Sequence, residues 1–327
     1  MPRRQLTDFE LGDQIGAGTV GTIFHARDRK GGPGVALKLL NPGVTNDPLV
    51  RQRFEREILI LKRLRHPNIV TYFDSGETDG QLFYTMEFVE GRTLKDVLTG
   101  RGHLTWQEAT ECGWQICSAL QHAHNHGVIH RDLKPANLYL SKDGSVKLGD
   151  FGIALDLGAS QITDHGMTVG SYMYMSPEQI RGEPVSELTD LYALGCLLYE
   201  MLTGAPPFIG SSFAQIFDQH LNAPIPSVRE MAASCPEPID TLIRLLLDKD
   251  PGGRPINARE AQGTLAQTCF DERGINLRAM FEERLGTAGV QELVVGGGYE
   301  REVSWSRLAM IAGLLAVGIA AAALLGR

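Results

Sequence analysis

The chain has 327 residues and a formal net charge of −8 at pH 7, with 43% hydrophobic and 21% charged residues. This composition excludes a wholly disordered chain, and the length is sufficient to bury a core without disulfide or metal staples. The acidic balance excludes the overall basic footprint of a nucleic-acid-binding protein, so no nucleic acid is expected as a partner. The 5 cysteines include no CxxC pair, which favours neither a disulfide framework nor a thiolate zinc site.

Taken in chain order, the hydrophobic pattern predicts a small strand-rich region followed by a larger helical one. The predicted strands lie at 9–28, where two strands flank a glycine turn, and at 33–40, 69–74 and 82–88. The predicted helices lie at 47–64, 105–126 and 188–203. Strands that precede a run of helices are typical of an α+β chain with two lobes.

The first motif with chemical content is the segment Gly16-Ala17-Gly18-Thr19-Val20-Gly21, between the first two predicted strands. Glycine lets a backbone approach phosphate groups closely. A dinucleotide-binding fold would need a helix directly after the glycines, but residues 22–26 continue as a strand. Lys38, on the third predicted strand, could reach phosphate oxygens and pair with Glu57, although without further motifs a surface lysine and a surface glutamate would be the favoured interpretation.

Two further motifs are His130-Arg131-Asp132-Leu133-Lys134-Pro135-Ala136-Asn137 and Asp150-Phe151-Gly152. Together with the glycine segment and Lys38, they resemble the eukaryotic-type (Hanks-type) Ser/Thr protein kinases in order and spacing over residues 9–267. Within that family the chain is most similar to the bacterial membrane-tethered branch. The resemblance implies a bilobal protein kinase fold, with a β-rich N-lobe carrying one helix over 9–88 and a mostly helical C-lobe over 89–267.

The resemblance also implies a role for each matching residue in phosphoryl transfer from ATP. Asp132 would orient the substrate hydroxyl and accept its proton, and Lys134 would neutralise charge on the γ-phosphoryl group. Asn137 and Asp150 would bind Mg²⁺, with Mn²⁺ as an alternative ion. The residues that match the family's ATP site are Ile15, Gly16, Gly18, Gly21, Ile23, Ala36, Lys38, Glu57, Met86, Glu87, Val89 and Tyr139.

Other matches concern the frame around the site. The side chains that match the stack joining the two lobes are Leu61, Tyr72, His130 and Phe151, with Asp190 at its base. Arg254 matches the buried partner of Glu178. The main departure from the family pattern is Tyr139, which replaces a smaller aliphatic residue at the floor of the adenine pocket. It is expected to alter nucleotide affinity or inhibitor fit.

The resemblance implies specificity for Ser and Thr hydroxyls, through Lys134 and through the segment 170–175, which is similar to the family's GTxxYM segment. Because Arg131 precedes Asp132, a phosphate on the activation segment could pair with Arg131 and order that segment. The candidate phosphosites, in order of preference, are Thr168, Thr163 and Ser160. The alternative is that all three are merely polar loop residues.

The C-terminal residues 308–325 carry no charge and no proline, and as a helix they would span about 27 Å, near the thickness of a hydrocarbon core. Trp305 stands at one edge of this stretch as an interfacial residue would. We therefore expect a transmembrane helix over 307–326 that contacts membrane lipid, preceded by a juxtamembrane linker over 268–306. Small residues that recur every four positions would allow a homodimer, but in an alanine-rich helix they also arise by chance.

Two histidines, His122 and His126, are four residues apart in the predicted helix 105–126 and could bind a metal. No carboxylate or cysteine nearby in the sequence supplies a further ligand, so packing or surface roles are favoured.

The leading hypothesis is thus a Ser/Thr protein kinase that uses ATP and Mg²⁺, acts on protein substrates and phosphorylates its own activation segment. It would be a single-pass protein of the cell membrane with its kinase domain in the cytoplasm, where ATP is found. One alternative is a catalytically inactive pseudokinase scaffold. The presence of every residue named above for catalysis argues against it. Another is a small-molecule kinase, which the peptide-docking segment 170–179 opposes.

Overall fold

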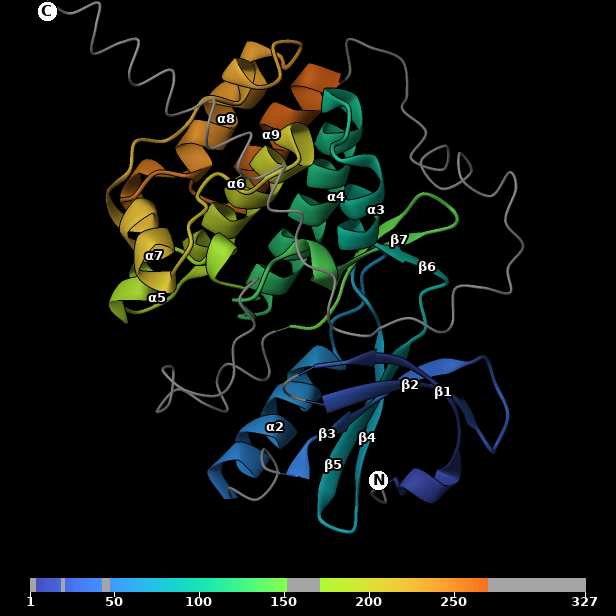
Figure 1. Ribbon diagram of the computed structural model, residues 1–327. Helices are drawn as coiled ribbons and strands as arrows, with labels where there is room; N and C mark the ends of the chain where they lie inside the picture. Colours follow the sequence, from blue (N-terminus) through green and yellow to red (C-terminus); the bar gives the residue numbers. More distant parts are fainter. Residues whose placement is uncertain (1–3, 19–20, 43–47, 152–170, 270–327) are drawn as a thin grey trace, which may run out of the picture. The chain divides into compact units, whose positions relative to one another are not determined.

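The computed structural model of the chain describes residues 4–18, 21–42, 48–151 and 171–269. All of these residues belong to one compact unit. Figure 1 shows a strand-rich region near the N-terminus and a region of packed helices that contains the rest of the described chain. The α+β class and the two lobes expected from the sequence are therefore confirmed.

The N-lobe is an antiparallel sheet of 5 strands, in the spatial order β1-β2-β3-β5-β4, with a helix against it. Its elements are β1 (Phe9–Ala17), β2 (Gly21–Asp28), β3 (Val35–Leu40), α2 (Pro48–Leu61), β4 (Tyr72–Thr78) and β5 (Gln81–Glu87). Phe54, Ile58 and Leu61 recur at helical spacing and are buried. The Phe54 ring lies 6.2 Å from the ring of Tyr84 on β5, so this apolar stripe fixes α2 on the sheet.

One N-lobe strand begins later than its sequence pattern predicts, at Tyr72 rather than residue 69. Ile69 forms a parallel bridge with Leu148, and the Val70 backbone N donates to Leu148 O at 2.9 Å. The apolar residues before Tyr72 therefore pair with a strand of the other lobe instead of extending β4.

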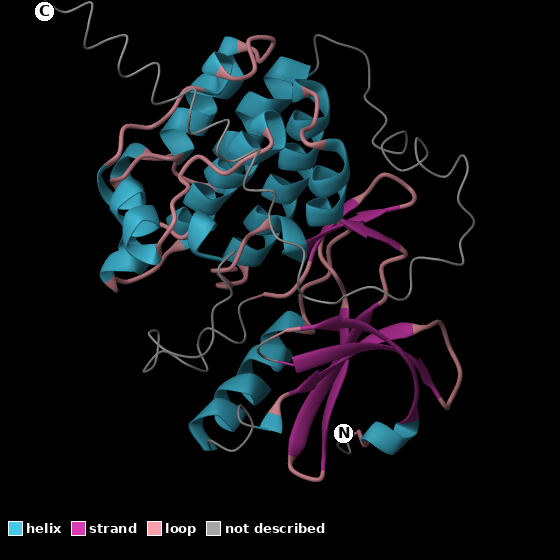
Figure 2. Cartoon of the chain, viewed as in Figure 1, coloured by secondary structure: helices cyan, strands magenta, loops and turns pink. Residues whose placement is uncertain are grey.

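The C-lobe combines a small sheet, in the order β6-β7-β8, with packed helices (Figure 2). Its strands are β6 (Gly91–Thr93), β7 (Leu138–Ser141) and β8 (Val146–Leu148). Its helices are α3 (Leu94–Arg101), α4 (Trp106–Asn125), α5 (Pro177–Arg181), α6 (Glu187–Thr203), α7 (Phe213–Asn222), α8 (Glu237–Leu246) and α9 (Ala258–Cys269). Single 3₁₀ turns lie at η1 (Leu6–Asp8), η2 (Pro135–Asn137), η3 (Ser171–Tyr174), η4 (Val228–Glu230) and η5 (Pro251–Gly253).

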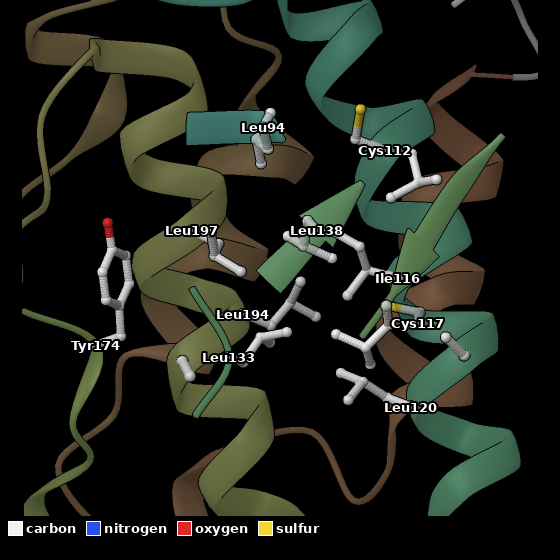
Figure 3. Close-up of a cluster of buried hydrophobic side chains, with 14 of the residues drawn as sticks. Leu94, Cys112, Ile116, Cys117, Leu120, Leu133, Leu138, Tyr174, Leu194 and Leu197 are labelled. Carbon is white, nitrogen blue, oxygen red and sulfur yellow. The ribbon is translucent and has the colours of Figure 1, made fainter. Parts of the chain in front are cut away.

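Helix α6 lies inside the C-lobe, because most of its side chains are apolar around its whole circumference. Figure 3 shows Ile116 and Leu120 of α4 facing Leu194 and Leu197 of α6. All four side chains are at most 1% exposed. Four of the cysteines are buried free thiols, and burial raises the pKa of the Cys117 thiol, so these side chains act as small apolar groups.

Within the described residues, no helix is both long enough and apolar enough to cross a bilayer. The predicted span 307–326 lies outside the described residues, as does the predicted linker 268–306 except for its first two positions. Those two positions form the last residues of α9.

A buried ion pair joins the segment before α6 to the loop before α9. Arg254 donates to both carboxylate oxygens of Glu178, at 2.8 and 2.9 Å, and its Nε donates to Asp248 O at 2.9 Å. The two side chains are 0% and 4% exposed. Burial alone would raise the pKa of Glu178, but the hydrogen bonds and the positive charge of Arg254 outweigh burial and hold that pKa below its usual range.

Replacing Arg254 by methionine leaves the Glu178 carboxylate buried without its cation. We expect Arg254→Met to lower the free energy of unfolding of the full chain by about 3–5 kcal/mol, measured by urea denaturation. Arg181→Met is the matched control, because Arg181 and Glu183 are 3.9 Å apart and 42% and 51% exposed. The control should change stability by less than about 1 kcal/mol. Equal stability of the two variants would contradict this account of the ion pair.

Candidate active site

The loop between α4 and β7 carries the residues predicted for catalysis, and Asp190 at the start of α6 holds its backbone. Asp190 accepts hydrogen bonds from His130 N and Arg131 N, each at 2.8 Å, and from His124 Nε2 at 2.8 Å. Burial alone would raise the pKa of Asp190, but these donors keep it below its usual range, so the carboxylate stays charged. Asp190 therefore sits at the base of the site, as the resemblance implies.

The structure brings together the residues predicted to act on the substrate hydroxyl. Lys134 Nζ lies 2.9 and 2.7 Å from the two carboxylate oxygens of Asp132. Asn137 Nδ2 donates to the Asp132 backbone oxygen at 2.8 Å and to Oδ2 at 3.2 Å. The Asp132 carboxylate is 24% exposed, so it is fixed by its neighbours while still open to an incoming group.

Lys38 on β3 and Asp150 after β8 form an ion pair between the two lobes, and Lys147 of β8 forms another with Glu87 of β5. Lys38 Nζ lies 2.7 Å from Asp150 Oδ1, and the two side chains are 16% and 17% exposed. Burial would lower the pKa of Lys38 and raise that of Asp150, but their attraction outweighs burial, so the pKa of Lys38 is raised and that of Asp150 is lowered. The pairing of Lys38 with Glu57, expected from the sequence, stays a prediction.

The donor set around Asp150 and Asn137 suits a divalent cation such as Mg²⁺. Because Asn137 directs Nδ2 toward Asp132, its oxygen Oδ1 is left to act as a ligand. The backbone N of Gly149 donates to Asn137 O at 2.9 Å, which holds the segments of the two predicted ligands side by side. Carboxylate and amide oxygens are the hard ligands that Mg²⁺ prefers.

The residues predicted to bind ATP come from several elements of both lobes. They lie on β1 (Ile15, Gly16), in the described part of the following turn (Gly18), on β2 (Gly21, Ile23), β3 (Ala36, Lys38), α2 (Glu57) and β5 (Met86, Glu87), before β6 (Val89) and on β7 (Tyr139). Sheet pairing places Ile23 opposite Lys38, and Ala36 opposite Met86. These pairings bring the glycine segment, the lysine and the segment after β5 together across neighbouring strands.

Two glycines are required by close approach of other groups. A Cβ on Gly21 would collide with the backbone oxygen of Leu39, so only glycine fits at that end of the predicted phosphate loop. A Cβ on Gly149 would lie 2.8 Å from Tyr139 Cε2 and 3.1 Å from Val70 Cγ2. The larger Tyr139 is therefore accommodated by the missing side chain of Gly149, a pairing that sequence reasoning missed because the two residues lie on different segments.

The negative charge of Asp150 and, after it, burial raise the pKa of the Tyr139 phenol. The ring of Tyr139 thus packs on Gly149 while its hydroxyl is close enough to Asp150 to sense its charge. Because Tyr139 replaces the family's aliphatic residue, it changes both the wall of the predicted nucleotide site and the surroundings of Asp150, a predicted metal ligand.

The described end of the activation segment, which is expected over 150–178, is tied to α6 by a buried contact. The Tyr174 hydroxyl donates to Glu200 Oε2. Burial raises the pKa of Glu200 to about 7, although the hydrogen bond from Tyr174 opposes this shift. The candidate phosphosites Ser160, Thr163 and Thr168 lie outside the described residues, so their part in regulation stays a prediction.

The two histidines considered as a metal site, His122 and His126, pack ring against ring at a tilted angle of 40°. The His122 ring lies 4.5 Å from that of His126 and 5.0 Å from that of His66. In the part of the chain that the structure describes, no group of three or more His, Cys, Asp or Glu residues is placed to hold a metal ion.

Gly149→Ala should disturb the contact with Tyr139, because overfilling a packed site costs about 1–3 kcal/mol. We expect this loss in the free energy of unfolding, together with weaker binding of Mg-ATP by calorimetry. The double variant Gly149→Ala/Tyr139→Leu should recover most of both, since leucine leaves room for the added methyl group. Additive effects of the two substitutions in this double-mutant cycle would show that the residues do not interact.

Comparisons with known proteins point to the same family as the sequence motifs. The family model described as "Protein kinase domain" matches residues 9–264. The chain is 40% identical to the serine/threonine-protein kinase PknB of Mycolicibacterium smegmatis over 271 residues. This alignment covers 81% of this chain and 43% of that protein. The chain is 39% identical over 262 residues to the serine/threonine-protein kinase PrkC of Bacillus subtilis, covering 80% of this chain and 40% of that protein. The chain thus spans about two fifths of the length of these curated relatives.

A solved structure supports the same assignment. The kinase domain of Mycobacterium tuberculosis PknI, crystallised as a point mutant, matches with a TM-score of 0.65 at 27% identity, over 82% of this chain and 98% of that one. The motif residues, the two-lobed fold and the extent of these matches together place the chain in the Hanks-type Ser/Thr protein kinase family.

Proposed function

We propose that this chain is an ATP-dependent protein kinase that transfers the γ-phosphoryl group of ATP to Ser and Thr hydroxyls of protein substrates. The observation that carries the proposal is the assembly of Asp132, Lys134 and Asn137 beside the Lys38–Asp150 pair. The transition state of phosphoryl transfer is stabilised mainly by positioning and by cations near the phosphoryl oxygens. This constellation offers both.

Each side chain has a separate task in the proposed reaction. Asp132 accepts the hydrogen bond, and finally the proton, of the substrate hydroxyl, while Lys134 lies against its carboxylate and places positive charge beside the transferred group. Lys38 holds phosphate oxygens of ATP. Asn137 and Asp150 hold Mg²⁺, which when bound neutralises charge on the phosphate oxygens. The presence of all of these residues in one chain, with Asp132, Lys134 and Asn137 in mutual contact, supports an active enzyme over a pseudokinase scaffold.

The kinase activity is tested with the full chain, Mg²⁺, labelled ATP and a generic protein substrate. We expect transfer by the wild type, a loss of about 10²–10⁴-fold in kcat for Asp132→Asn, and a loss of ATP binding and activity for Lys38→Met. Mass spectrometry of the wild-type chain should find phosphate on Thr168, Thr163 or Ser160. Absence of transfer by a wild type that binds Mg-ATP would favour the scaffold.

We further propose that residues 307–326 anchor the kinase in the cell membrane as a single-pass helix, with residues 9–267 on the cytoplasmic side. The support is the uncharged apolar stretch 308–325 and the need of the kinase site for cytoplasmic ATP. Small residues that recur at four-residue spacing within this stretch would let two copies pack as a homodimer.

The membrane proposal predicts that the full chain stays in the membrane fraction after an alkaline carbonate wash, whereas a chain that lacks 308–325 is released. Replacing Leu314 and Leu315 by arginine should release the chain as the deletion does, because each arginine at a bilayer centre costs about 2.5–3.5 kcal/mol. Release of the unaltered chain by the wash would refute the proposed anchor.

A further inference from the structure

The side chain of Gln179 on α5 bridges the peptide-docking side of the site and the catalytic loop. Its Oε1 accepts hydrogen bonds from Ser176 N at 3.0 Å and from Ser176 Oγ at 3.2 Å. Its Nε2 donates to Arg131 O at 3.1 Å. One amide thus caps the N-terminus of α5 with its oxygen and reaches the residue before Asp132 with its nitrogen.

The acceptor of this bond is the carbonyl of the peptide that leads directly into Asp132. The other side of Arg131 is held as well, because its N–H donates to Asp190 Oδ1 at 2.8 Å. Arg131 has φ of 66°, a left-handed conformation that is unfavourable for a residue with a side chain and persists only where its surroundings enforce it. Gln179 and Asp190 therefore hold the two ends of this strained residue from opposite sides.

The choice of glutamine at position 179 agrees with the hydrogen bond to the Arg131 carbonyl. Capping boxes take either Glu or Gln at this position, and the positive helix N-terminus favours a carboxylate. The capping boxes of α3 and α4 do use carboxylates, Asp96 with Thr93 and Glu108 with Thr105. A carboxylate at 179 would cap α5 equally well but has no N–H to give to the Arg131 carbonyl. Glutamine is the side chain that can do both.

We propose that Gln179 is a positioning residue for phosphoryl transfer, which orients Asp132 through the Arg131 peptide and couples it to the segment at Ser176. The inference rests on the proposed role of Asp132 as the group that receives the substrate proton. Ser176 is 0% exposed, and the residues just before it form η3. A shift of the docking segment would therefore be transmitted to the Asp132 carboxylate through a single amide.

Gln179→Glu separates the two tasks, because it keeps the cap on α5 and removes only the donor to Arg131. In the full chain we expect kcat on a short peptide to fall about tenfold or more, since small misplacements of a reacting group are costly. KM for ATP should stay within about twofold, because the predicted ATP-binding residues lie elsewhere, and the retained cap should leave the urea midpoint of unfolding close to that of the wild type.

The pH profile distinguishes positioning from a merely structural effect. In Gln179→Glu, the protonated form of the new carboxyl group can donate to Arg131 O as the amide does. The ratio of variant to wild-type kcat should therefore rise as the pH is lowered from about 8 to about 5, because a glutamate side chain with an ordinary pKa of about 4.3 takes up protons appreciably only near that pH. Gln179→Met has no donor at any pH, and its ratio should stay low and flat.

The chain offers a matched control in Gln215 of α7. Its Oε1 accepts from Ser211 N and Ser211 Oγ, both at 2.9 Å, and its backbone N donates to Ser212 Oγ at 3.3 Å. Gln215→Glu alters the same chemistry at another helix start and should leave kcat within about twofold, because surface substitutions of this kind have small effects.

The outcomes separate this inference from the proposed function. A wild-type chain without transferase activity would overturn the proposed kinase and this inference with it. An active wild type, with Gln179→Glu equal to it in kcat, would overturn the inference alone. So would a loss of kcat in Gln179→Glu that is matched by Gln215→Glu or that has the same pH dependence as Gln179→Met.

Discussion

The geometry of the active site depends on one buried carboxylate, Asp190. A carboxylate that is 1% exposed would be strongly unfavourable without partners, so it must accept hydrogen bonds wherever the chain can supply them. It takes two of them from consecutive backbone N–H groups of the catalytic loop, at His130 and Arg131. Its place in the first turn of α6 adds the favourable field of a helix N-terminus. Because the buried charge of Asp190 needs these hydrogen bonds, it fixes the conformation of the catalytic loop at His130 and Arg131.

Helix α6 gives Asp190 a fixed position because the rest of the C-lobe encloses this helix. Leu191, Leu194 and Leu198 are 0% exposed, and a close-packed interior of this kind resists displacement. The same helix receives the Tyr174–Glu200 hydrogen bond near its other end. Helix α6 therefore holds both the loop that carries Asp132, the group proposed to contact the substrate hydroxyl, and the segment proposed to dock the substrate peptide.

The N-lobe meets this frame at β8. The backbone N of Leu148 donates to Asn68 O, and Val70 N donates to Leu148 O, each at 2.9 Å. The Asn68 side chain adds bonds to Gln115 Oε1 at 2.7 Å and to Val146 O at 2.9 Å. Asp150 follows two residues after Leu148, so this junction sets its position, and its bond to Lys38 then joins the two lobes. His130 and Phe151, whose rings lie 4.8 Å apart, pack directly behind it.

Sequence alone was enough to predict the class of fold, the two lobes and the family, whereas the roles of the site residues stay predictions. Each of these is encoded locally: helical and strand periodicities lie within single elements, and the chemistry-bearing residues stand in short contiguous motifs such as residues 130–137 and 150–152. The predicted helix 188–203 and the observed α6 differ by one residue at its start and none at its end, because its apolar pattern is strong and its end is marked by Gly204.

The contacts that only the tertiary structure decided all join residues far apart in the chain. They include the ion pair of Lys38 with Asp150, the bridge of Ile69 with Leu148 of β8, the packing of Tyr139 on Gly149 and the hydrogen bond from Gln179 to Arg131. No local pattern specifies them, because each depends on how close two packed elements come and on which polar groups burial leaves in need of a partner. The sequence by itself thus determined which chemically reactive residues the protein has, whereas the packing of distant elements determined which of their side chains contact one another.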